Sequence, residues 1–101
     1  MKLIKKLNDF IEDEIEGAEH YAKCALKLRD DHPDIARLLH NMATQEMGHM
    51  ADLHNAVVNV IAEYRQKNGE PPASMQAVYD YLHEKHIDEA EKVKRLLAMY
   101  K

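Results

Sequence analysis

Residues 35–60 read IARLLHNMATQEMGHMADLHNAVVNV, and a single, almost entirely apolar stripe runs along them. Its members, spaced alternately four and three residues apart, are Ile35, Leu39, Met42, Glu46, His49, Leu53, Ala56 and Val60. This spacing is typical of a long helix that packs one face against other helices. Only Glu46 and His49 are polar, and residues three apart share a helix face. A buried carboxylate without a partner costs on the order of several kcal/mol, so we predict that this face binds a cation.

The preceding segment carries a second stripe with a similar polar interruption. Its members are Leu3, Leu7, Phe10, Glu14, Tyr21 and Leu28. Because Glu14 interrupts this stripe as Glu46 and His49 interrupt the other, we predict that the two faces meet and that the three polar side chains lie together.

Two breaks divide the chain into three helices. Residues 30–34 (DDHPD) and 68–72 (NGEPP) contain the prolines and the glycine that end helices. We therefore predict an all-α fold in one domain, residues 1–101, with helices over about 3–30, 34–67 and 74–99. The short first loop predicts an antiparallel helical hairpin. The second helix, roughly 50 Å long at about 1.5 Å per residue, is too long for a compact three-helix bundle to cover alone, so a partner chain is expected.

Composition excludes several classes of function. The net charge of −4 argues against a general nucleic-acid-binding protein, and a single cysteine excludes an internal disulfide bond. No apolar run approaches the roughly 18 residues that a membrane span needs, and the first residues lack the apolar core of a signal peptide. We therefore expect no nucleic acid and no membrane as partners, and a cytoplasmic location or one inside a protein compartment.

A Glu-x-x-His pair on one helix and a Glu on its neighbour form half of a carboxylate-bridged dinuclear site in four-helix bundles. One chain supplies one such half through Glu14, Glu46 and His49, so a symmetric homodimer would complete the site. Doubling the two glutamates provides four carboxylates, which two divalent cations would neutralise. Mixed oxygen and nitrogen ligands favour iron or manganese, and zinc is also compatible.

Other residues allow two interpretations each. Tyr21 is either a core aromatic or the donor of a hydrogen bond to a ligating carboxylate. Glu16 is either solvated or an auxiliary ligand. His86, with Glu89 three residues further on, marks either a second site or a hydrogen-bonded histidine between helices.

Three segments resemble the ferritin-like superfamily, closest to the short encapsulated ferritin-like proteins that are related to rubrerythrins. They are residues 12–21 (EDEIEGAEHY), 32–35 (HPDI) and 46–49 (EMGH), and a Glu followed by a Tyr seven positions later is shared with rubrerythrins and ferritins. The resemblance implies a helical hairpin that dimerises into a four-helix bundle, and dimers that assemble into rings. It also implies a di-iron ferroxidase centre between subunits.

The resemblance also assigns roles to individual residues. The implied iron ligands are Glu14, Glu46 and His49, and Asp13 and Glu16 occupy the positions of an outer entry site. The family's tryptophan before the tyrosine is replaced by His20, and no targeting tail follows Tyr100. An encapsulating shell is therefore a weaker expectation than the iron chemistry.

Two other functions remain compatible with the same residues. One is a metal-free helical interaction module whose Glu–His pairs set the alignment of a dimer. The other is a bundle that buffers metal without redox turnover. The ferroxidase-type oxidoreductase is the favoured hypothesis.

Overall fold

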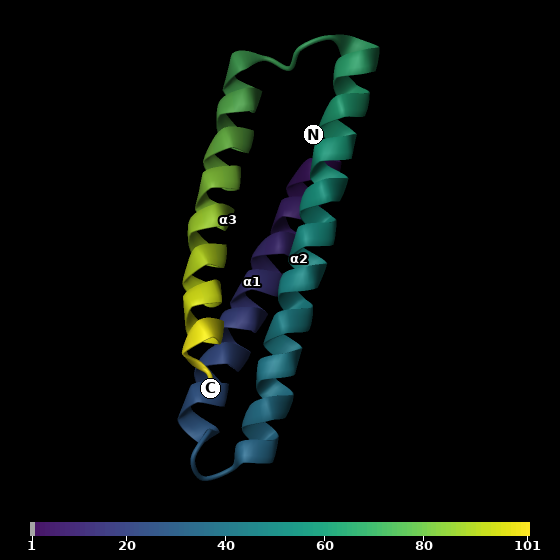
Figure 1. Ribbon diagram of the computed structural model, residues 1–101. Coiled ribbons are helices and arrows are strands. Elements are labelled where there is room, and N and C mark those ends of the chain that lie inside the picture. The colour runs from purple at the N-terminus through teal and green to yellow at the C-terminus, as the bar shows by residue number, and fades with distance from the viewer. Residues whose placement is uncertain (1) are drawn as a thin grey trace.

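The structure is a computed structural model that describes residues 2–101, and within them it contains three long α-helices and no strand. The helices are α1 (Lys2–Leu28), α2 (Pro33–Asn68) and α3 (Ala73–Met99). They lie side by side in an elongated bundle of 56 × 17 × 17 Å (Figure 1). The predicted all-α class is confirmed, and each helix begins and ends within two residues of its expected limits.

Residues within each of the two loops explain why the helices end there. Pro33 occupies the start of α2, where its missing N–H needs no partner, and Asp34 lies in the first turn of that helix. At the other end, Gly69 adopts a φ of 77° and donates its N–H to the Arg65 carbonyl. This left-handed conformation suits glycine, and Pro71 and Pro72 follow. The chain therefore reverses twice, so that α1 and α3 run in parallel and α2 runs against both (Figure 1).

The core of the hairpin uses a different face of α1 from the one that we predicted. Its buried positions on α1 are Ile4, Ile11, Ile15, Ala18, Ala22 and Ala25, and on α2 they are Ala36, Ala43 and Val57. Leu3, Phe10 and Ile35, from the predicted stripes, are 51%, 44% and 49% exposed. Other members of the stripes, Leu7, Leu53 and Val60, are partly buried and pack against this core. The small alanines allow the two helices to approach closely.

Helix α3 buries one face against the other two helices. His86, Ala90 and Val93 are buried, and the neighbouring Tyr79 and Leu97 pack against the core. Helix α3 contacts α1 far more than α2. At the C-terminal end of α3, the Met99 carbonyl accepts a hydrogen bond of 3.1 Å from the Arg29 guanidinium. Because Arg29 directly follows α1, this hydrogen bond joins the C-terminal ends of α1 and α3.

None of the described helices combines the length and the apolar character that a membrane span requires.

Candidate metal centre

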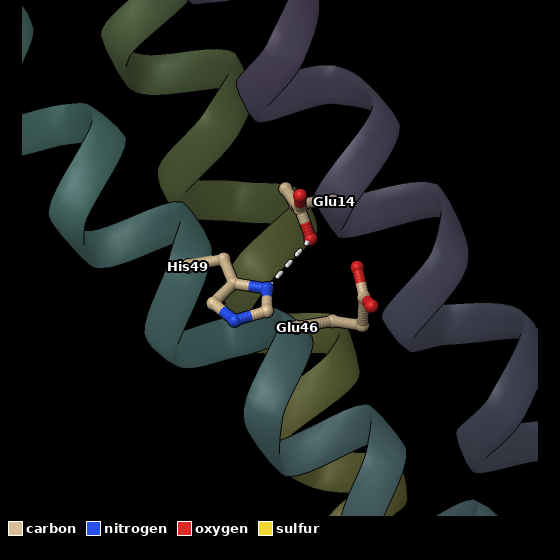
Figure 2. Close-up of side chains that lie close together, drawn as sticks. All are labelled: Glu14, Glu46 and His49. Carbon is tan, nitrogen blue, oxygen red and sulfur yellow. Dashed lines mark ion pairs between the residues drawn. The ribbon is translucent and has the colours of Figure 1, made fainter.

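Glu14, Glu46 and His49 converge between α1 and α2 (Figure 2). Each side chain offers one ligand atom, and the three atoms all lie within 4.8 Å of one another. Within residues 2–101, this is the one group of three or more acidic, histidine or cysteine side chains that meets this criterion. The polar side chains that interrupt two separate apolar stripes are thus neighbours in space.

The local structure explains why these three meet. Glu46 and His49 are separated by one helical turn on α2 and project from the same face. Glu14 comes from α1, and Gly17, one turn further along, leaves the α1 surface open beside it. A Cβ placed at Gly17 would lie 3.5 Å from the Glu46 Oε2 atom. The Glu46 carboxylate therefore lies close to the α1 backbone at this glycine.

The cluster is accessible from one side. The His49 side chain is 59% exposed and that of Glu14 is 26% exposed. Figure 2 shows the three side chains between the α1 and α2 ribbons, with the α3 ribbon behind them. An ion, or another copy of the chain, can therefore approach without displacing α3.

Hydrogen bonding within the cluster is incomplete. The His49 Nδ1 atom lies 3.4 Å from the Glu14 Oε2 atom, which is too long for a good N–H···O hydrogen bond. The same Glu14 oxygen is buried and has no hydrogen-bond partner. A buried acceptor in this state carries a desolvation cost, which a bound cation would remove.

The surroundings of Glu46 favour its protonated form. The pKa of Glu46 is raised, first because Glu14 is placed to accept a hydrogen bond from its protonated form, then by burial and by repulsion from the Glu14 charge. His49 lowers the pKa of Glu46. A cation bound here would stabilise both carboxylates in place of the proton. Two oxygen ligands and one imidazole nitrogen match the preferences of iron and manganese, and zinc is also compatible.

Two other predicted site residues lie outside this cluster. Glu16 is exposed and Tyr21 is half-buried, and neither belongs to the group of converging ligand atoms. The Tyr21 ring is a neighbour of the His20 ring, at 6.3 Å between centroids. Asp13 is also exposed. The roles of Glu16 and Tyr21 at a metal centre stay predictions.

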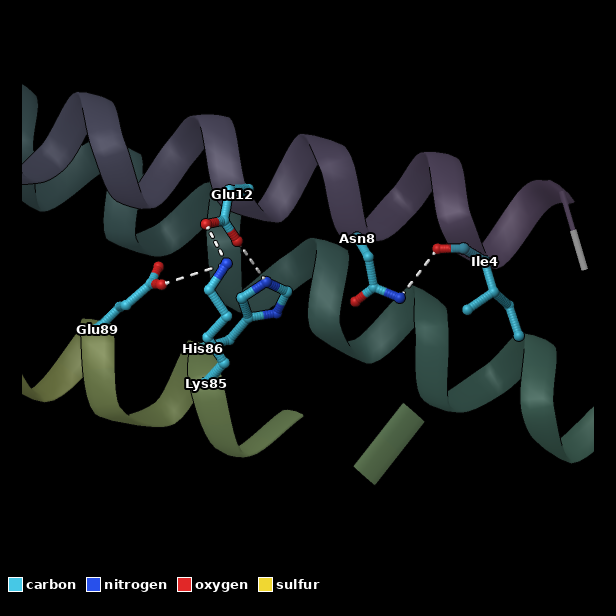
Figure 3. A network of polar contacts seen from close by, with 6 residues as sticks. All are labelled: Ile4, Asn8, Glu12, Lys85, His86 and Glu89. Atoms are coloured by element: carbon cyan, nitrogen blue, oxygen red, sulfur yellow. Dashed lines mark hydrogen bonds and ion pairs between the residues drawn. The ribbon is translucent and has the colours of Figure 1, made fainter. Parts of the chain in front are cut away.

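His86 is a hydrogen-bonded histidine between helices rather than a partner of Glu89. It is buried, and its Nε2 atom lies 2.9 Å from the Glu12 Oε2 atom (Figure 3). Lys85 bridges Glu12 at 2.9 Å and Glu89 at 3.7 Å. These contacts lower the pKa of Glu12, chiefly through the Lys85 hydrogen bond.

Sequence reasoning missed Glu12, although one signal was present. Glu12 and Glu19 are seven residues apart on α1, and Lys85 and Lys92 are seven apart on α3. Matching charges at one heptad spacing indicate neighbouring helices. In the structure Lys92 lies 2.9 Å from Glu19, in the same arrangement as Lys85 and Glu12.

Comparisons with protein-family models, with curated proteins and with solved structures give no significant match. What the cluster does must therefore be inferred from its own residues. Two carboxylates from separate helices, with a histidine one turn from the second, define a carboxylate–histidine arrangement of the kind that binds metals within helical bundles.

Proposed function

We propose that this protein belongs to the carboxylate–histidine metal proteins built on helical bundles. Within that class we propose a ferritin-like di-iron protein that binds two Fe(II) ions per pair of subunits and oxidises them. The observation that supports the proposal best is the convergence of Glu14, Glu46 and His49 within 4.8 Å. The buried, unpartnered oxygen of Glu14 adds to it.

The site of one chain is incomplete for two metals, because dinuclear centres of this type use two Glu-x-x-His pairs and two further glutamates. A second copy related by a two-fold axis would supply the missing half. The exposed side chains of Leu3, Phe10 and Ile35 support such a partner. They belong to the same two stripes as the three ligands, so one docking event would cover them and pair the half-sites.

The proposed chemistry treats Fe(II) as the substrate. Glu14 and Glu46 of the two chains would supply four negative charges, which balance two divalent cations, and His49 would be the neutral nitrogen ligand of each. Each Fe(II) loses one electron, and dioxygen accepts both electrons with two protons to become hydrogen peroxide. Supplied peroxide is the alternative oxidant. The protein's part is to hold two ions next to each other, about 3.5–4 Å apart in such centres.

The test is anaerobic Fe(II) titration of the wild type and of Glu46→Gln, followed by oxygen uptake on mixing with air. We expect about one Fe(II) per chain and oxygen consumption for the wild type. Glu46→Gln should lose both, because an amide oxygen carries no charge to hold the cation. Glu63→Gln, an exposed glutamate of the same helix, is the matched control and should behave as the wild type. Unchanged iron loading in Glu46→Gln would reject the assignment.

Two outcomes identify the other functions. Protein purified without chelator that contains no stoichiometric transition metal, and does not bind added Fe(II), would be a metal-free helical interaction module. Protein that binds Fe(II) at Glu46 but consumes no oxygen or peroxide would be a metal-buffering bundle.

A further inference from the structure

Three histidines line the space between α2 and α3, away from the Glu14–Glu46–His49 cluster. Two clefts of about 210 and 250 Å³ share His54, His83 and His86 among their lining residues. His54 comes from α2, and the other two lie three residues apart on one face of α3. Three imidazoles from two helices therefore border one region.

Two of the rings are already in contact. The His54 and His83 rings stack with their centroids 4.8 Å apart and an angle of 22° between their planes. His54 is partly buried, whereas His83 is exposed. The exposed ring of His83 is therefore able to turn about its side-chain bonds without disturbing the core.

The third ring is held by a carboxylate in the way that metal-ligating histidines usually are. An ionised carboxylate only accepts hydrogen bonds, so the Nε2 atom of His86 donates to Glu12 across 2.9 Å. In the neutral ring the Nδ1 atom then carries the free lone pair, and Figure 3 shows this nitrogen directed away from Glu12. Such a carboxylate–histidine pair orients the ring and raises its basicity toward a metal.

We propose that His54, His83 and His86 form a second metal site, for a borderline divalent cation such as Zn²⁺, with Glu12 as the carboxylate that positions His86. Three imidazoles and a water molecule suit tetrahedral Zn²⁺, unlike the carboxylate-rich cluster between α1 and α2. The three histidines do not form a converging group of ligand atoms in this structure, so binding requires their side chains to rotate, beginning with the exposed His83. Because α3 contacts α2 sparsely, the bound ion would link these two helices.

The experiment uses the full chain carrying Glu46→Gln, which removes the charge that the iron proposal requires. Co²⁺ alone, and then Zn²⁺ in competition, are titrated. We expect one Co²⁺ per chain with the intense visible bands of tetrahedral coordination, displaced by Zn²⁺. His83→Gln should remove those bands and the binding, and helix content should persist because His83 is exposed. His32→Gln is the matched control, because His32 is exposed and makes no side-chain cap.

A second variant tests whether Glu12 positions the His86 ring. Glu12→Gln keeps an acceptor for the Nε2 atom of His86 but removes its charge, so Co²⁺ binding should weaken about 10- to 100-fold. The visible bands should keep their positions. Equal affinity for Zn²⁺ with and without His83 would overturn the proposed site, and so would no binding at micromolar Zn²⁺. Either result leaves the Fe(II) proposal intact, because its ligands are different residues.

Discussion

At the scale of single residues, Glu46 is a side chain whose ionisation is disfavoured by its surroundings. Its pKa is raised because Glu14 and burial both favour the protonated form. Between the ordinary pKa of a glutamate and this raised value, the folded chain binds more protons than the unfolded chain. The metal-free protein therefore gains stability from Glu46 as the pH falls through that window, and loses this contribution as the pH rises above it.

The first prediction follows from this dependence of stability on pH. In the presence of a chelator at pH 7, Glu46→Gln should raise the free energy of unfolding by about 0.5–1 kcal/mol, the range of partly exposed charge pairs. The gain should shrink as the pH falls through the folded-state pKa of Glu46, since the wild-type side chain then becomes protonated. Urea unfolding of both proteins at several pH values measures this difference in the free energy of unfolding. A variant less stable than the wild type at pH 7 would show that the carboxylates do not repel.

His54 has the opposite dependence on pH. Its pKa is lowered, chiefly by burial, so the unfolded chain takes up this proton at a higher pH than the folded chain. Its contribution to stability is therefore complete above the unfolded-state value and declines as the pH falls below it. We expect His54→Gln to reduce the loss of stability between pH 7 and pH 5 in chelator-treated protein. Thermal melts across this range test the prediction, with His32→Gln as the control. An unchanged slope would contradict it.

At the scale of helices, the contact between α1 and α3 combines an apolar seam with a row of ion pairs. Glu12 pairs with Lys85 and Glu19 pairs with Lys92, at equal spacings on two parallel helices. Because α3 has few contacts with α2, α1 supplies most of its support. The alignment of α3 is therefore determined by α1.

The third prediction concerns this row of charges. Lys92→Glu should destabilise the protein by about 0.5–1 kcal/mol at low salt, because it brings a carboxylate next to Glu19. The exchange Glu19→Lys with Lys92→Glu should restore part of the loss, although Lys23 also pairs with Glu19. The exposed Arg95→Glu serves as the control. Equal destabilisation by the single and the double variant, in urea unfolding, would show that the pair does not align α3.

At the scale of the whole molecule, the bundle leaves apolar side chains exposed along the helices that carry the metal cluster. Leu3, Phe10 and Ile35 are each close to half exposed. In the proposed dimer, these residues would be covered by the second copy.

The fourth prediction tests that dimer. Phe10→Ser should shift the protein from dimer to monomer in sedimentation experiments, and Fe(II) binding should weaken with it, because each chain would retain only half of a dinuclear site. Tyr81→Ser removes an exposed aromatic side chain of α3 instead and should change neither property. Retention of a full-affinity Fe(II) site by monomeric protein would contradict the shared centre.

The sequence alone determined the three helices, both breaks, and the prediction that Glu14 would meet Glu46 and His49, because local spacing and helix-ending residues carry that information. Only the tertiary structure decided that Ile4, Ile11 and Ile15, rather than Leu3 and Phe10, face the core. It also decided that Glu12 pairs with His86 and that His54 stacks on His83. Periodicity reports which residues share a helix face. The rotation and stagger of one helix against another depend on how closely their alanines let them approach, and that is a property of the packed pair.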